Sequence, residues 1–184
     1  MKASEADIFI IPGLDNSGPD HWQSRWEDKI RSARRIEQLD WANPQMESWV
    51  SKIIADVEQA TRPAVLVAHS LGVVATVKAA AAIAPGIVRG AFLVGMPNVE
   101  SDDHVPGHIR HFAPIPEEQL PFPSILVASR SDPYCAFETA EHFGRKWGST
   151  FVDAGDTGHI NEKSGQGPWP EGLMTFANFM TKLS

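Results

Sequence analysis

The sequence predicts an α/β fold, with a parallel sheet that helices cover on both faces. Short apolar segments alternate along the chain with longer segments whose apolar residues recur every three or four positions, which are the patterns of buried strands and of helices. The strand segments are apolar without interruption, as is typical of parallel sheets buried on both sides. The 184 residues contain no internal repeat, low-complexity tract or linker, so we expect residues 1–184 to form a single domain.

The first half of the chain is expected to contribute three strands and two helices. Residues 7–11 form a short apolar strand that ends at a Pro-Gly pair. A helix follows Pro19, because proline suits a first helical turn. Residues 35–39 give a second strand with a weak pattern, and residues 46–57 carry the clearest helical periodicity of the chain. Residues 64–69 form the third strand.

The second half adds strands and helices in the same alternation. Three strands are expected at residues 90–94, 124–128 and 150–152. The helix that starts after residue 70 is apolar on nearly all sides, which indicates that it is buried. Two more helices are expected, one over residues 136–147 and one from about Pro170. The sheet should therefore have about six parallel strands.

The junction between the strand at residues 64–69 and the helix after it is the most informative feature of the sequence. Residues 64–74 read Ala-Val-Leu-Val-Ala-His-Ser-Leu-Gly-Val-Val, which has the form small-x-Ser-x-Gly of a nucleophile elbow. Small residues flank the serine in such a turn because the strand and the helix nearly touch there. Gly72 fills one of these positions, and Ala68 stands where glycine is usual. Ser70 is therefore the predicted nucleophile.

A serine hydroxyl needs an adjacent base, and the base needs an orienting acid. In sheets with this kind of elbow the chain order is Ser, then Asp or Glu, then His. Among the seven histidines, His159 follows the last expected strand in a glycine-containing loop, so it is the predicted base. His69 adjoins the serine and is expected to point away from it.

Asp132 is the predicted acid, because it follows the strand at residues 124–128 in a short turn that contains a proline. Asp153 and Asp156 are the alternatives. They lie closer to the histidine in sequence, but we interpret them as turn or cap residues.

An oxyanion hole needs two backbone N–H groups that point at the developing charge. One is expected from Leu71, at the start of the helix after the elbow. The other is expected from the glycine-containing loop that follows the first strand, where Leu14 is the preferred donor and Asp15 the alternative.

Composition and charge narrow the class of protein. The formal net charge of −7 argues against a nucleic-acid partner. No apolar run reaches 18 residues, so no membrane span is expected, and the start of the chain lacks the apolar core of a signal peptide. The single cysteine, Cys135, has no partner for an internal disulfide. A cytoplasmic protein is expected.

Residues 97–123 hold six prolines and little periodicity. The segment is too long for an ordinary connection, and it follows a strand end, where sheets of this kind bind ligands. We interpret it as a short cap over the site. Its three histidines, His104, His108 and His111, match no familiar metal-ligand spacing, so no metal is expected.

Longer motifs point to a particular family. They are Gly-Leu-Asp-Asn-Ser-Gly-Pro-Asp-His-Trp-Gln-Ser-Arg-Trp-Glu from residue 13, Asp-Trp-Ala-Asn-Pro from residue 40, the elbow, Ser-Asp-Pro-Tyr from residue 131, Gly-His-Ile-Asn from residue 158 and Ser-Gly-Gln-Gly-Pro-Trp-Pro-Glu-Gly from residue 164. In these motifs the chain resembles the small serine-hydrolase family typified by YdeN and the retinoblastoma-binding serine hydrolase, within the α/β-hydrolase superfamily. The resemblance implies Ser70 as nucleophile, Asp132 as acid and His159 as base. It also implies a compact α/β-hydrolase fold without the superfamily's first antiparallel pair of strands.

These features together predict a serine hydrolase that needs no cofactor and cleaves small acyl esters. Cleavage of amides or aminoacyl peptides by the same residues is the alternative, and thioester cleavage is less favoured because no basic patch suggests a coenzyme A tail. An alternative of another class is a protein-binding module that keeps the hydrolase fold with little activity. The expected partner is a small acyl ester or amide, and the sequence gives no support for a protein partner.

Overall fold

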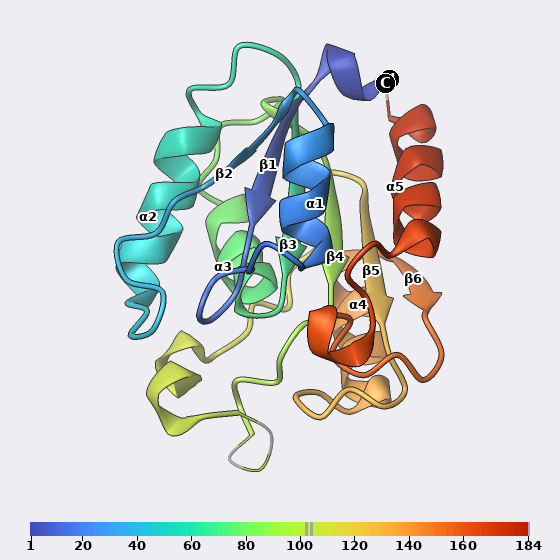
Figure 1. Cartoon of the computed structure of the whole chain (residues 1–184). Helices are drawn as coiled ribbons and strands as arrows, with labels where there is room; N and C mark the ends of the chain where they lie inside the picture. Colours follow the sequence, from blue (N-terminus) through green and yellow to red (C-terminus); the bar gives the residue numbers. More distant parts are fainter. Residues whose placement is uncertain (102, 104, 184) are drawn as a thin grey trace.

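The computed structural model describes residues 1–101, 103 and 105–183. In this part of the chain, six strands form one parallel sheet in the order β2-β1-β3-β4-β5-β6 (Figure 1). The strands are β1 (Asp7–Ile11), β2 (Ala33–Arg35), β3 (Ala64–His69), β4 (Val88–Val94), β5 (Ser124–Ala128) and β6 (Thr150–Asp153). The helices are α1 (Trp22–Lys29), α2 (Met46–Val57), α3 (Leu71–Ala80), α4 (Phe137–Trp147) and α5 (Pro170–Lys182), with short 3₁₀ helices η1 (Ala3–Glu5), η2 (Gly107–Phe112) and η3 (Glu162–Ser164). This confirms the predicted parallel α/β fold.

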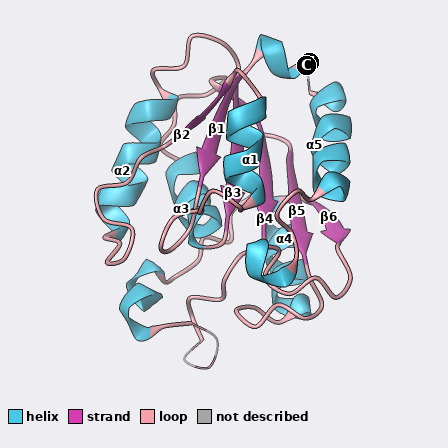
Figure 2. Ribbon diagram, viewed as in Figure 1, coloured by secondary structure: helices cyan, strands magenta, loops and turns pink. Residues whose placement is uncertain are grey.

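The helices lie on both faces of the sheet, and the pleat of each strand assigns its side chains to one face or the other. Phe9 and Leu66 pack with α2, α3 and α4 in one core cluster. Their neighbours Ile8 and Val65 pack with α1 and α5 in the other. Figure 2 shows α1 in front of the strands and α4 behind them. Because β1, β3, β4 and β5 each contribute to both clusters, their sequences are largely apolar.

The second strand differs from its predicted position. The structure has β2 at Ala33–Arg35 instead of residues 35–39. The guanidinium of Arg34 lies 4.4 Å from the centre of the Phe9 ring, and Arg35 forms an ion pair with Glu27. A search for runs of apolar residues misses this edge strand, because two of its three residues are arginines. The aliphatic stem of an arginine can lie along apolar surface although the residue is charged.

The strand order reverses direction at β1, which pairs with β2 on one side and β3 on the other. In sheets of this type, ligands bind beyond the carboxyl ends of the strands at such a reversal. Ile11 lies opposite Ala68 in the parallel register of β1 and β3. The loop that follows β1 therefore lies beside the junction of β3 and α3, where the sequence predicts the nucleophile.

The far ends of the same two strands are joined by a buried carboxylate. Asp7, at the start of β1, is only 1% exposed. It accepts hydrogen bonds from the backbone N–H groups of Thr61 and Arg62 and from the Arg62 guanidinium, just before β3 begins. Burial acts to raise the pKa of Asp7, but these donors outweigh it and hold the pKa below its ordinary value. The ion pair of Asp7 and Arg62 therefore joins the amino-terminal ends of β1 and β3.

The described helices include none that is both long enough and apolar enough to cross a membrane. The described part of the proline-rich segment at residues 97–123 extends beyond the carboxyl ends of the strands and contains η2 (Figure 1).

Candidate active site

Ser70 occupies a strained backbone conformation between β3 and α3. Its φ and ψ angles are 55° and −130°, a region that residues with a side chain rarely adopt. At Gly72 the first turn of α3 lies against the end of β1, where an added Cβ would lie 2.4 Å from the carbonyl oxygen of Ile11. Ala68, at the position where glycine is usual, is fully buried. The turn has the shape of a nucleophile elbow.

The structure brings together the three side chains that the sequence singles out. The Oγ of Ser70 lies 2.8 Å from Nε2 of His159, and Nδ1 of the same imidazole lies 2.9 Å from Oδ2 of Asp132. The side chains of His159 and Asp132 are 9% and 4% exposed. Ser70, Asp132 and His159 follow β3, β5 and β6, respectively. These three parallel strands all end at the same edge of the sheet. This geometry allows the serine proton to pass to the imidazole.

Hydrogen bonds connect the Asp132 loop to the loop that carries the histidine. The hydroxyls of Ser129 and Ser131 accept from the backbone N–H groups of Thr157 and Gly158. Asp132 itself also accepts from the N–H of Tyr134. Asp132 and His159 are therefore positioned against each other through the backbones of their loops as well as through their side chains.

Asp153, one of the alternatives to Asp132, is engaged elsewhere. Its carboxylate pairs with Arg130 and accepts a hydrogen bond from the N–H of Gly155, two residues further on. This is the behaviour of a turn residue.

The position of His69 differs from the expectation. Its ring does not turn away from the site: it lines the site cavity and lies with its centre 4.9 Å from the centre of the His159 ring. It is on the face of β3 that carries Val65 and Val67, toward α1. The alternation along the strand could have indicated this face, but not the contact with His159.

The two expected oxyanion donors lie in the loop between β1 and α1, which carries Leu14, and at the start of α3, which carries Leu71. The backbone N–H groups of Leu14 and Leu71 donate to no described residue. The N–H of Asp15, the alternative donor, is bonded to the carbonyl of Trp41 at 2.9 Å. Gly13 lies directly against the elbow, since a Cβ built on it would be 2.9 Å from the nitrogen of Leu71. Leu14 therefore remains the better candidate.

Polar residues that follow this loop hold it in place. Arg35 donates to the side chain of Asn16 at 2.6 Å and to the carbonyl of Ser17 at 2.9 Å. The side chain of Gln23, fully buried, donates to the carbonyls of Ile11 and Val67 and accepts from the hydroxyl of Ser17. Helix α1 is thereby bonded to the ends of both β1 and β3.

A cavity of about 370 Å³ opens onto Ser70 and His159. Its apolar wall includes Pro97, Val105 and Ile109 from the proline-rich segment, and its other lining residues include Tyr134 and His21. The ring of Tyr134 lies edge-on to His159, with 4.5 Å between ring centres. The cap interpretation is thus supported for these described residues.

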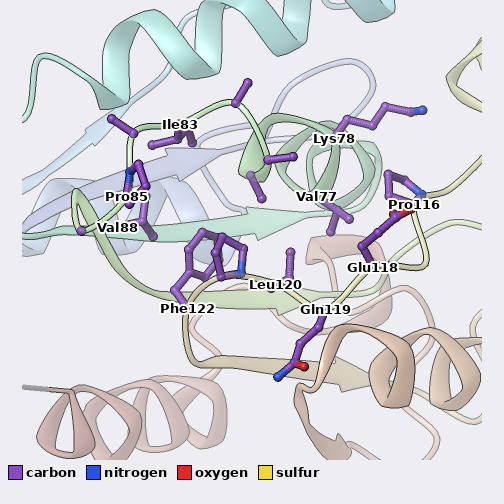
Figure 3. A pocket seen from close by; sticks show the side chains of 16 residues that line it. Val77, Lys78, Ile83, Pro85, Val88, Pro116, Glu118, Gln119, Leu120 and Phe122 are labelled. Atoms are coloured by element: carbon purple, nitrogen blue, oxygen red, sulfur yellow. The ribbon is translucent and has the colours of Figure 1, made fainter.

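A larger cavity of about 750 Å³ lies away from this site (Figure 3). It is formed by the end of α3 and residues 116–122, including Val77, Leu120 and Phe122. Its lining residue on α3 that is nearest to Ser70 in sequence, Val77, lies about 10 Å further along the helix axis, at 1.5 Å per residue. The described residues that line it include no serine, cysteine or histidine.

Burial controls the protonation of several side chains near the site. Burial lowers the pKa of His21 to about 3, and it lowers the pKa of His69 well below its ordinary value. Both imidazoles are therefore neutral at pH 7. Burial also raises the pKa of Cys135 to about 12, so this thiol stays protonated and unreactive.

Two histidines of the proline-rich segment, His108 and His111, do not line the site cavity. His108 and His111 are exposed on η2, and His104 lies outside the described residues.

The six-stranded parallel sheet with a serine at the elbow after β3 defines an α/β-hydrolase fold. At the level of sequence, a model of the family described as serine hydrolase matches residues 8–178. The chain belongs to this serine hydrolase family. No curated protein sequence matches it significantly.

Solved structures agree with this assignment. A YdeN-like hydrolase from Pectobacterium atrosepticum is 31% identical, with 96% of this chain and 91% of that one covered and a TM-score of 0.85. YdeN from Bacillus subtilis is 16% identical, with coverage of 97% and 100% and a TM-score of 0.76. Esterase 2 from Thermogutta terrifontis with bound butyrate is 16% identical, with coverage of 97% and 83% and a TM-score of 0.67. The last two similarities concern the fold alone.

Proposed function

We propose that the protein hydrolyses small carboxylic esters through an acyl-enzyme formed on Ser70. The observation that carries the proposal is the continuous contact of three groups at one cavity. The Ser70 hydroxyl lies 2.8 Å from the His159 imidazole, whose other nitrogen lies 2.9 Å from the Asp132 carboxylate. This arrangement suits a nucleophile, a general base and an orienting acid.

In the first half of the reaction, the Oγ of Ser70 attacks the ester carbonyl carbon while Nε2 of His159 takes the hydroxyl proton. The carbonyl oxygen becomes an oxyanion, which accepts hydrogen bonds from the N–H groups of Leu71 and Leu14. The carboxylate of Asp132 keeps the proton of His159 on Nδ1 and stabilises the imidazolium. The bond between carbon and the alcohol oxygen then breaks, and His159 gives its proton to the departing alcohol.

Water completes the reaction. A water molecule attacks the acyl carbon as His159 takes one of its protons, and the same oxyanion donors stabilise the second tetrahedral intermediate. When that intermediate collapses, the bond to Ser70 breaks, the carboxylic acid leaves, and the proton returns to the serine oxygen. Every proton removed in one step is returned in the next, so no cofactor is consumed.

The size of the cavity supports a small acyl group. A volume of about 370 Å³ is near the lower end of the range for ligand sites. The wall contributed by Val105 and Ile109 is apolar, which suits a short hydrocarbon chain. Esterase 2 from Thermogutta terrifontis, which shares the fold, holds butyrate in its solved structure.

Labelling with a fluorophosphonate probe tests the nucleophile and the acid together. The wild-type protein should be labelled and the Ser70→Ala variant should not. Asp132→Asn should slow labelling by about four orders of magnitude, because asparagine favours the wrong imidazole tautomer. Asp153→Asn, which alters a turn carboxylate, is the matched control and should label like the wild type. Labelling of Ser70→Ala at the wild-type rate would contradict the proposal.

Amide cleavage by the same groups is the alternative activity. Comparing turnover of short-chain esters with turnover of aminoacyl amides that have the same acyl part separates the two. We expect the ester to be preferred. A preference for the amide would assign the chain to the peptidase alternative, and turnover of neither by a protein that still binds partners would favour a binding module.

A further inference from the structure

We propose that His69 is a positioning residue that holds the backbone of His159 in reach of Ser70. The carbonyl oxygen of His159 lies 2.9 Å from Nε2 of His69. A carbonyl oxygen can only accept, so Nε2 carries the proton. The inference rests on the proposed function, because it gives His69 its role through the base of that reaction.

The loop that carries His159 lies outside the sheet ladder and depends on individual contacts for its position. Three of its residues are in the left-handed region: Gly155, Gly158 and Ile160, with φ of 70°, 57° and 50°. Ile160 is fully buried, and its carbonyl accepts from the indole N–H of Trp22 at 2.9 Å. The bond from His69 is the adjacent contact along the loop, and it acts on the residue that carries the imidazole.

The location of His69 makes its contact specific to the site. It is the last residue of β3 and directly precedes Ser70. A single side chain therefore links the strand that carries the nucleophile to the backbone of the base. Any displacement of the His159 backbone away from β3 must break or stretch this bond, so the bond limits the Ser70–His159 distances that backbone motion can produce.

The surroundings of His69 keep this donor intact. The residue is 5% exposed, and its ring lies between the rings of His21 and His159, with centres 4.7 Å and 4.9 Å away. Burial keeps the imidazole neutral by lowering its pKa. Gly95, with φ of 60°, leaves the space beside the bond free, because a Cβ built there would lie 3.3 Å from the carbonyl of His159.

Two variants separate the hydrogen bond from the packing of the ring. His69→Phe retains a flat ring of similar size but has no donor. His69→Gln loses the ring but places an amide N–H at a similar reach. Val65→Ala, a buried change on the same face of the same strand, reports the effect of a general loss of packing.

The steady-state constants should respond in a way that a loss of stability would not produce. We expect His69→Phe to lower kcat for a short-chain ester about 100-fold, the order that a displacement of about 1 Å can cause, with KM changed by no more than about twofold. His69→Gln should recover most of the lost kcat. Val65→Ala should retain kcat even where it lowers the melting temperature.

A second readout needs no substrate. In an ordered pair, the proton on Nδ1 of His159 that faces Asp132 gives a downfield imidazole resonance in the proton NMR spectrum. It should be present in the wild type, broadened beyond detection in His69→Phe and restored in His69→Gln.

The proposal is overturned if His69→Phe keeps both the wild-type kcat and the resonance, or if Val65→Ala lowers kcat as much as His69→Phe does. If ester turnover in the wild type does not depend on Ser70, the proposed function fails instead. The resonance then decides the role of His69 by itself: its persistence in His69→Phe contradicts the role, and its loss with recovery in His69→Gln supports it.

Discussion

Gly13 lies directly against Ser70 and has no space for a side chain. A Cβ built on it would lie 2.7 Å from the Cβ of Ser70 and 2.9 Å from the nitrogen of Leu71, which is closer than atoms can approach. The missing side chain lets the loop after β1 come near enough to Ser70 to bring the proposed oxyanion donor, the N–H of Leu14, into place.

Gly13→Ala should therefore lower kcat/KM by about 100-fold or more, since the loop must move away from Ser70 and carry the Leu14 donor with it. Gly18→Ala is the matched control: it lies in the same loop, and no atom outside its immediate neighbours is within 4 Å of its added Cβ. Steady-state kinetics on a short-chain ester compares the two. A Gly13→Ala enzyme as active as Gly18→Ala would refute this account.

The meeting of Ser70, Asp132 and His159 could be predicted from the sequence, because parallel strands end at one edge and chain order assigns each residue to a strand end. The contact of His69 with the His159 carbonyl could not. It depends on a backbone group whose direction is set by the left-handed residues around it, and no side-chain pattern encodes that direction.

At the scale of the elements, α1 is attached to the sheet by a polar side chain as well as by its apolar face. Gln23 is fully buried and bonds to the carbonyls of Ile11 and Val67, at the ends of β1 and β3. Buried carbonyls without donors are costly, so this residue stabilises the edge of the sheet where the site lies.

Gln23→Met, which keeps the length of the side chain but removes its donors, should lower the free energy of unfolding by about 2–3 kcal/mol. Gln45→Met is the control, because Gln45 is exposed, and it should change stability by less than about 0.5 kcal/mol. Urea unfolding followed by circular dichroism measures both. Equal stabilities of the two variants would show that the buried bonds contribute nothing.

The elements also show where sequence patterns fail. The strands β3 and β5 lie at their predicted residues, because an apolar run is the direct consequence of burial on two faces. The edge strand β2 carries Arg34 and Arg35 and is identified only by its pairing with β1. The position of such a strand is determined by tertiary contacts, which cannot be predicted from the local sequence.

At the scale of the whole molecule, we propose that residues 1–184 unfold as one cooperative unit, because the two core clusters share a single sheet. The stability of this unit should depend on two buried imidazoles. His21 has its pKa lowered from 6.5 to about 3 by burial, and His69 is shifted in the same direction. The unfolded chain therefore binds protons that the folded chain excludes.

Because the unfolded chain binds more protons, the free energy of unfolding increases with pH in this range. Stability contributed by the neutral imidazoles is complete above pH 6.5, where neither state is protonated, and it is lost as the pH falls toward about 3, where His21 in the folded state takes up its proton. Within that window each imidazole contributes a slope of at most about 1.4 kcal/mol per pH unit.

Urea unfolding between pH 7 and pH 4.5 should therefore show a single transition, and the free energy of unfolding should decrease as the pH is lowered. His21→Asn keeps a side chain that can cap α1 but cannot titrate, and its stability should decline less steeply than that of the wild type. Parallel curves for the two proteins would exclude His21 as a source of the pH dependence.

The pairing of Ile11 with Ala68 has a consequence for refolding. A slip of one residue between the two strands would displace Gly13 from the elbow by about 3.3 Å, while most of the secondary structure would survive. Such a misaligned chain would have a circular dichroism spectrum close to the native one and still lack catalytic activity. Recovered catalysis, more than recovered ellipticity, should thus gauge whether the ladder has closed in its native alignment.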